Sequence, residues 1–561
     1  MAEKKIEKIL NHKSKTITSA AFILIIATFI AKLTALFRDR IIASIFGATR
    51  AVDIYYSAFR LPDFIFNILV VGAISSVLIP VFADYWEKKS KKEAWLFFNN
   101  VLFVLSFFIL VISIFFIIFA PYLMKLIVPG FSQDDFKLVV LLTRVMFLSP
   151  LLLTISSIFS SLLQYFSKFL IYSFAPIVYN IGIIIGAVFF VPYFGVLGLA
   201  FGVVLGAFLH LLIQLPSVFN SGFRFHFVFN PKEKGLLKII KLGIPRTIAI
   251  AAGQIDLIIT TAIASMLMAG SIAVFNFSNN LQYVPVSLFG ISFSIAAFPA
   301  LSRSFSLKKR DDFIKKLTLT FSQIIFFIIP ICFLMFILRA QIVRVIYGAG
   351  NFSWQDTRLT AACLGLYAVA IFGQSLIPLF SQAFFSMQDT KTPVKINVFS
   401  IILDTIFTIV FVWAVAKISP ITEFFSSLLK LQGIKEIAVI GIPLAFSLSS
   451  TVNILLLIYA LKKKTGNHWE IKLRDIFLRI FLLSLFCALI CYGLLYLFAP
   501  IFGLETFLGV FLQMIFAGGI SIFIYVFFAK KLNFPEYKLL SGTLFKKVVE
   551  RANLIEIEAE P

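Results

Sequence analysis

The stretch ITSAAFILIIATFIAKLTALFRDRIIASIF, residues 17–46, is a long apolar run with charged side chains in its second half. A helix of this length can cross the roughly 30 Å of hydrocarbon in a bilayer. A Lys, Arg or Asp at the centre of such a helix costs about 2.5–3.5 kcal/mol, so charges there normally face a watery cavity. The second apolar run, 51–83, is also charged. The charges of the two runs are Lys32, Arg38, Asp39, Arg40, Asp53, Arg60 and Asp63. The stretch therefore predicts a membrane protein with a polar interior.

Similar apolar runs recur along all 561 residues, of which 60% are hydrophobic and 14% charged. Soluble domains carry about 25% charged residues. The runs lie near 17–46, 51–83, 94–120, 136–166, 171–191, 194–219, 236–268, 271–301, 313–338, 358–387, 394–416, 436–461, 475–499 and 504–529. They predict an all-α polytopic membrane protein with about 14 transmembrane helices.

The net charge of +23 is concentrated in alternate connections between these runs. Basic clusters lie at 4–15, 88–92, 232–238, 303–316, 462–464 and 530–547. By the positive-inside rule these connections are cytoplasmic, as are both termini, which requires an even number of helices. This placement argues against nucleic acid as a partner.

The chain also repeats itself. Three sequence pairs keep their order at a separation of about 220 residues, which is typical of parallel repeats in transporters. They are FSQDD with FSWQD (131 and 352), APIVYNIG with TPVKINVF (Pro176 and Pro393), and 72–80 with 290–299. Two pseudo-symmetric six-helix lobes are expected, at 1–230 (helices 1–6) and 231–462 (helices 7–12). Helices 13 and 14 and a cytoplasmic tail then occupy 463–561.

Between helices 11 and 12 the segment ITEFFSSLLKL, 421–431, alternates apolar and polar residues at helical spacing. This pattern favours a short amphipathic helix on the outer membrane surface.

Spacing groups the charges of the first two runs. Lys32 and Asp39 are seven residues apart, as are Asp53 and Arg60, so each pair shares a helix face. The alternative is that Arg38 to Arg40 are interfacial anchors. The second half contributes Arg246, Asp256 and the amides of Asn276, Asn279, Asn280 and Gln282. Arg246 could equally snorkel to the surface, and the amides could join helices.

Several functional classes lack their motifs. The sequence contains no P-loop, no nucleophile elbow and no zinc motif, so neither direct ATP use nor a membrane enzyme is indicated. The scattered histidines lack metal-ligand spacing, and Cys332, Cys363, Cys487 and Cys491 are read as apolar packing residues. No cofactor or metal is expected. The basic first lobe indicates an anionic substrate instead.

Six segments resemble the MurJ (MviN) family of lipid II flippases, within the multidrug/oligosaccharidyl-lipid/polysaccharide exporter superfamily. They are LFRDRIIASIFGATRAVDIYYSAFRLPD (36–63), VPGF (128–131), FAPIVYNIG (174–182), GIPRTIAIAAGQID (243–256), VPVSLFGISFSIAAFPALSR (284–303) and AFFSMQDTKTPVKI (383–396). The resemblance implies a fourteen-helix transporter of the bacterial cytoplasmic membrane. It would move the undecaprenyl-diphosphate-linked peptidoglycan precursor to the outer leaflet by alternating access, for cell-wall synthesis. It also implies a cationic central cavity and a groove for the lipid tail at helices 13 and 14.

The family's basic positions in helix one fall on Lys32 and Arg38, followed by Asp39, and its acid in helix two falls on Asp53. The family's usual arginine pair is replaced by Phe66 and Asn67, and its arginine in helix eight by Asn280. Basic residues elsewhere are expected to compensate. The expected substrate-binding set is Lys32, Arg38, Asp39, Arg40, Asp53, Arg60, Arg246 and Asn280. Candidates for coupling to Na⁺ or H⁺ are Asp39, Asp53 and Asp256, and the membrane potential is a second expected source of energy.

The expected partners are the lipid-linked glycan, membrane lipids and cell-wall synthesis enzymes. Two alternatives remain open at this point. The chain could export another lipid-linked oligosaccharide or polysaccharide precursor, or it could be a non-transporting scaffold for cell-wall enzymes. An antiporter of cationic drugs is disfavoured, because its cavity should be acidic.

Overall fold

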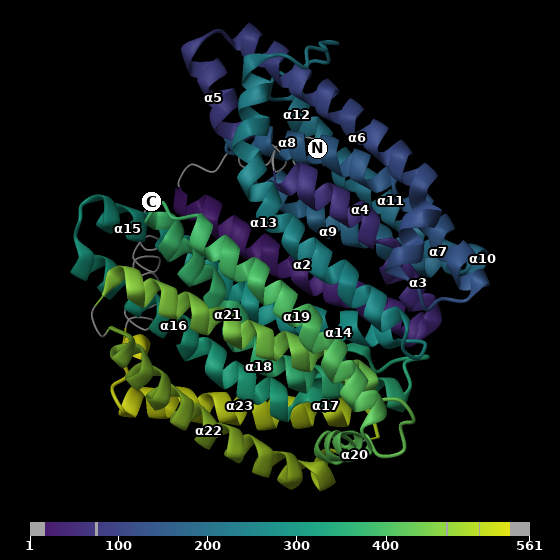
Figure 1. Ribbon diagram of the computed structural model, residues 1–561, viewed down its shortest axis with the longest axis vertical. Coiled ribbons are helices and arrows are strands. Elements are labelled where there is room, and N and C mark those ends of the chain that lie inside the picture. The colour runs from purple at the N-terminus through teal and green to yellow at the C-terminus, as the bar shows by residue number, and fades with distance from the viewer. Residues whose placement is uncertain (1–16, 73–76, 467–468, 504, 539–561) are drawn as a thin grey trace, which may run out of the picture. The chain divides into compact units, whose positions relative to one another are not determined.

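The computed structural model describes residues 17–72, 77–466, 469–503 and 505–538, and the regular elements within these ranges are helices (Figure 1). In this part of the chain, 11 helices are long and apolar enough to cross a membrane. The predicted all-α membrane fold is confirmed. The other three predicted segments, 17–46, 51–83 and 236–268, also contain helices within the described residues, and the count of 14 remains a prediction.

The chain forms two compact units, Met1–Phe277 with Ile346–Asp356, and Ser278–Val345 with Thr357–Pro561. The predicted lobe boundaries at 230 and 462 remain a prediction. The first unit contains α2 (Ile17–Phe46), α3 (Arg50–Ala58), α4 (Arg60–Phe66), the π-helix η1 (Asn67–Gly72), α5 (Leu78–Lys88), α6 (Lys91–Ile127), α7 (Gln133–Met146), α8 (Leu148–Tyr165), α9 (Phe169–Ile185), the π-helix η2 (Gly186–Phe190), α10 (Val191–Phe194), α11 (Leu197–Leu212), α12 (Leu215–Phe219) and α13 (Lys234–Ser265).

The helix α14 (Ser271–Pro285) begins in the first unit and ends in the second. The second unit continues with the π-helix η3 (Val286–Ile291), α15 (Ser292–Ser306), α16 (Arg310–Ile337), α17 (Arg339–Tyr347), α18 (Trp354–Ser386), α19 (Lys391–Lys417), α20 (Ser419–Leu428), the 3₁₀-helix η4 (Ala438–Ile440), α21 (Gly441–Thr465), α22 (Trp469–Phe502) and α23 (Phe507–Lys531). The last residues of α17 and the first of α18 belong to the first unit.

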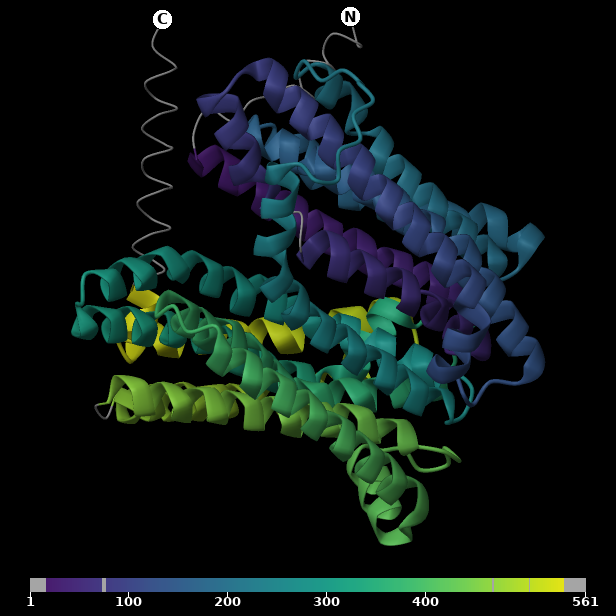
Figure 2. The ribbon, with the colours of Figure 1, turned by 45° about the horizontal axis from the view of Figure 1, so that its top comes forward.

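The predicted short helix before α21 is present as α20, which projects beside the end of α19 (Figure 2). Its Phe424 and Leu428 are 60% and 53% exposed, which is the apolar face that an interfacial helix needs. The location of α20 on the outer surface of the membrane remains a prediction.

Local structure repeats where the sequence repeats. Ser132 Oγ accepts a hydrogen bond from the Asp135 amide at 3.3 Å, and Ser353 Oγ accepts one from the Asp356 amide at 3.1 Å. Each serine thereby satisfies an amide in a first helical turn. The π-helices η1 and η3 also lie at matching places in the two halves. These features support the inferred repeat.

Within the first unit, α9 and α11 pack so closely that their backbones touch. A Cβ added to Gly182 would lie 2.3 Å from the Gly206 Cα, and one added to Gly186 would lie 2.4 Å from the Gly202 Cα. Small residues allow this approach in a membrane, where van der Waals packing drives helix association.

We expect Gly206→Ala to lower the free energy of unfolding by about 1–3 kcal/mol, because its Cβ would lie 2.4 Å from the Tyr179 carbonyl oxygen. The matched control is Gly253→Ala in α13, where a Cβ meets nothing within 4 Å. That change should be neutral or stabilise by about 0.5–1 kcal/mol, since alanine favours helix. Unfolding of the detergent-solubilised protein measures both. Equal stability of the two variants would contradict the close packing.

Candidate functional site

Arg38 of α2 is the centre of a polar cluster within the first unit. Its Nε and Nη2 donate to Asp39 Oδ1 at 2.9 and 2.7 Å, and its Nη1 donates to Asn180 Oδ1 of α9 at 2.9 Å. The Asp39 side chain is 2% exposed and that of Arg38 is 17% exposed. A buried cation is tolerable only with such partners, so Asp39 serves as the counter-ion of Arg38.

Arg60 of α4 is buried at 6% exposure and joins three segments. Its Nε donates to Thr261 Oγ1 of α13 at 2.8 Å, and its Nη2 donates to Asn276 Oδ1 of α14 at 2.9 Å. Both acceptors are neutral, so these bonds satisfy donors without cancelling the charge. Asp63, one turn further along α4, interacts electrostatically with both Arg60 and Arg38. The two arginines therefore share an acidic neighbour.

Asp53 of α3 is fully buried and caps another helix. Its Oδ2 accepts a hydrogen bond from the Gly270 amide at 2.7 Å, and its Oδ1 accepts one from the Ala273 amide at 2.8 Å. These amides belong to the start of α14, where the helix dipole favours an anion. Arg50 lies 3.4 Å from the same carboxylate. Asp53 thus fixes the position of α14 relative to α3.

The other predicted site residues are spread further. Arg40 donates to the Ile346 carbonyl at 3.1 Å and lines a separate, mainly apolar cavity of about 560 Å³. Lys32 on α2 and Asp256 on α13 are partly buried. Arg246 lies in α13, but its side chain is outside the described part. Asn280 belongs to the second compact unit.

Two polar residues in these networks, and one buried acid of the second unit, were not predicted. Arg50 joins Asp53 to Asp135, 3.7 Å away, and lies 4.6 Å from the ring of Phe131. Asn180 had been noted only as a repeat marker. Asp404 is a buried acid of α19 that accepts from Ser449 Oγ at 2.7 Å. The rule that singled out Lys32, a charge inside an apolar run, applies equally to Asp404.

The second unit contains an apolar groove of about 210 Å³ between α16, α22 and α23. It is lined by Phe326, Phe327, Pro330, Ile331, Leu334, Cys487, Ala488, Ser521, Ile522, Tyr525 and Val526. The Tyr525 hydroxyl donates to the Phe326 carbonyl at 2.8 Å, so the polar end of its side chain is bonded. The groove therefore offers an apolar surface suited to a hydrocarbon chain.

Among the described residues, no group of three His, Cys, Asp or Glu side chains lies close enough together to hold a metal ion. Long apolar helices with buried arginines define a polytopic membrane protein of transporter type. Solved structures share this fold. The match to lipid II flippase MurJ in an inward closed conformation has a TM-score of 0.72 at 23% identity, covering 91% of this chain and 99% of that one. An inward-facing MATE family multidrug resistance transporter matches with a TM-score of 0.60 at 15% identity, covering 79% and 100%.

The family relationship is shown by sequence. The sequence model described as "Lipid II flippase MurJ" matches residues 42–517, and the chain belongs to that family. The probable lipid II flippase MurJ of Buchnera aphidicola subsp. Acyrthosiphon pisum is 28% identical over 504 residues, covering 89% of this chain and 94% of that protein. That of Rickettsia prowazekii is 30% identical over 399 residues, covering 70% and 77%. The predicted resemblance is confirmed.

We expect Asp53→Ala to lower the free energy of unfolding by about 1–2 kcal/mol, because two amides at the start of α14 lose their acceptor. Asp53→Asn keeps one acceptor oxygen and should fall between Ala and the native residue. Thermal unfolding measures the series. The control is Asp134→Ala, whose side chain is 95% exposed, and which should stay within about 0.5 kcal/mol of the native protein. The capping role is wrong if the two alanine variants match.

Proposed function

We propose that this chain moves lipid II, the diphosphate-linked peptidoglycan precursor, from the inner to the outer leaflet of the bacterial cytoplasmic membrane. The observation that carries the proposal is the pair of arginines, the partly buried Arg38 and the buried Arg60, in a chain that belongs to this flippase family over residues 42–517. A membrane protein keeps such cations at a cost, so they imply an anionic cargo. Transport, rather than bond chemistry, is the activity that follows.

Arg38 is suited to hold a diphosphate because guanidinium groups bind phosphate oxygens through two parallel hydrogen bonds. Two of its donors, Nε and Nη2, are bonded to Asp39. An arriving diphosphate would replace the Asp39 carboxylate, so the cation stays partnered at every stage. Asp39 is thus a resident counter-ion that competes with the cargo.

Arg60 complements this arrangement, since its contacts with Thr261 and Asn276 fix the guanidinium without supplying negative charge. We propose that Lys32, Arg38 and Arg60 capture the headgroup, and that Arg40, Arg246 and Asn280 belong to the same substrate-binding set. Asp53, whose two oxygens hold α14, supports the site by position.

The energy for outward movement of an anion is available from the membrane potential. An inside-negative potential favours it by about 2.3 kcal/mol per charge per 100 mV. Alternating access with both termini in the cytoplasm follows from the repeat and the charge pattern. Coupling to Na⁺ or H⁺ would act on Asp39 or Asp256, with Asp53 a third candidate. The partners proposed are membrane lipids and enzymes of cell-wall synthesis.

The polyprenyl tail is assigned to the apolar groove of α16, α22 and α23. Its lining is almost wholly hydrocarbon and aromatic, so the tail finds there an apolar environment like that of the lipid. The tail stays in the bilayer while the headgroup crosses.

Complementation tests the proposed activity. Expressed in a bacterium depleted of its own lipid II flippase, the native chain should restore growth and expose lipid II in the outer leaflet. The double variant Lys32→Ala/Arg38→Ala should not, because the headgroup loses two cations. The control Lys137→Ala removes a charge that is 75% exposed and should rescue fully. Failure of a well-inserted native chain would reassign the cargo to another lipid-linked glycan.

Filling the groove should impair transport without unfolding the protein. Ala488 lines the groove and is 2% exposed. We expect Ala488→Trp to slow lipid II exposure at least about tenfold, because the larger side chain occupies the space proposed for the tail. Leu489→Trp is the control, because Leu489 is 63% exposed on the same helix. The rate of lipid II exposure in cells with equal protein levels is measured. Equal rates for the two variants would contradict the proposal that the tail lies in this groove.

A further inference from the structure

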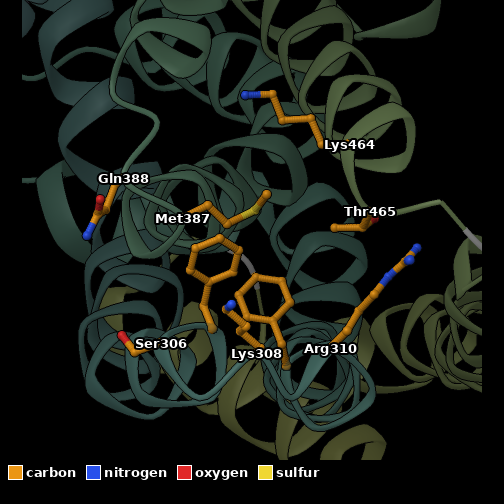
Figure 3. Close-up of a pocket in the computed structure, with 9 residues that line it drawn as sticks. Ser306, Lys308, Arg310, Met387, Gln388, Lys464 and Thr465 are labelled. Carbon is orange, nitrogen blue, oxygen red and sulfur yellow. The ribbon is translucent and has the colours of Figure 1, made fainter.

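A second cavity, of about 430 Å³, lies within the second unit, remote in sequence from the charges of α2 to α4. It is formed by the connection from α15 to α16, the end of α18 and the end of α21 (Figure 3). Its lining is Phe305, Ser306, Lys308, Arg310, Phe313, Met387, Gln388, Lys464 and Thr465. Two of these segments bring three cations to one hollow, Lys308 and Arg310 from the α15–α16 connection and Lys464 from α21.

The cations exceed the acidic charge beside them. Asp389 forms an ion pair with Lys464, and the Thr392 amide donates to the same carboxyl group at 3.0 Å. Burial raises the pKa of Asp389, but the hydrogen bonds from Lys464 and Thr392 outweigh it and lower the pKa to about 2. Asp389 is therefore ionised at neutral pH and compensates one cation. The cavity retains an excess of positive charge.

Two residues that line the cavity have a left-handed backbone conformation at a helix end. Lys308 and Gln388 have φ of 55° and 59°, and they are two of the five non-glycine residues with positive φ in the described ranges. Each ends a helix: the Lys308 amide donates to the Phe305 carbonyl and the Gln388 amide to the Phe385 carbonyl, both at 2.9 Å. Glycine is the usual residue at such left-handed helix ends. A lysine and a glutamine there both face the cavity.

The floor of the cavity is apolar, because Phe305, Phe313 and Met387 line it beside the cations. Met387 and Lys308 lie close together in the close-up, while Lys464 and the Arg310 guanidinium lie apart from them (Figure 3). Cations and apolar side chains in one cavity suit a ligand with an anionic head and a hydrocarbon body. The three segments belong to connections that the charge pattern places on the cytoplasmic side, where anionic lipid headgroups gather.

We propose that this cavity binds the phosphate headgroup of an anionic phospholipid of the cytoplasmic leaflet, as a site separate from the path of the transported lipid. Lys308 and Arg310 contact the phosphate, and Lys464 does so while held by Asp389. Phe305, Phe313 and Met387 contact the glycerol and the upper acyl chains. Inorganic phosphate shares the charged part of this chemistry and lacks the apolar part. The proposal does not depend on the cargo being lipid II.

Native mass spectrometry of the full-length protein, purified free of lipid II, tests the site by titration with phosphatidylglycerol and with phosphatidylcholine. The variant Lys308→Gly should weaken phosphatidylglycerol binding about fivefold while the protein keeps or gains thermal stability, because glycine suits the turn. Adding Arg310→Ala should weaken it about fivefold again. The control Lys309→Ala/Lys315→Ala removes two exposed cations of the same connection that do not line the cavity, and should leave binding unchanged.

Each other outcome overturns the proposal. Equal phosphatidylglycerol binding by the cavity variants and the control would show a diffuse charge effect. Equal binding of phosphatidylcholine would show that the anionic head is not recognised. Displacement of phosphatidylglycerol by millimolar inorganic phosphate, with no residual lipid preference, would assign the site to free phosphate. Complementation by the same variants reports separately on transport, so the two proposals fail independently.

Discussion

The need to partner every buried charge organises the first compact unit. Arg38 is bonded to Asp39 and Asn180, Arg60 to Thr261 and Asn276, and Asp53 to the start of α14. Each partnership crosses from the first two membrane segments to a helix elsewhere in the unit or to a neighbour on the same helix. Breaking one leaves a charged group without its hydrogen-bond partner in a medium where that costs several kcal/mol. The charges that suit an anionic cargo are therefore also what fixes α2, α3 and α4 in place.

This double use constrains how the site works. The hydrogen bonds of Arg60 go to neutral oxygens, whereas Arg38 is bonded directly to a carboxylate, which an anion would have to replace. In the proposed function, the two arginines therefore differ in how strongly they hold a headgroup and how easily they release it. A transporter needs both properties, since a cargo bound too firmly would not leave on the far side.

The sequence was sufficient for the helical membrane fold, because long apolar runs have few other solutions. It was also sufficient for the family, through segments such as 383–396. It could not predict the partners. The seven-residue spacing of Lys32 and Asp39 indicated a shared face, yet Asp39 accepts hydrogen bonds from Arg38. The long arginine side chain bends toward its sequence neighbour, although the two residues start in different directions around the helix. The cap formed by Asp53 depends on amides more than 200 residues later. The sequence does not show that Asp404 bonds to Ser449, which lies on another helix 45 residues later.

The glycine contacts between α9 and α11 have a mechanical consequence. Two helices whose backbones touch cannot slide along each other without first separating, so the pair moves as one rigid body when the protein changes conformation. Asn180 lies on this pair, two residues from Gly182, and accepts a hydrogen bond from the Arg38 guanidinium. A tilt of the helix pair therefore moves the hydrogen-bond partner of Arg38 with it.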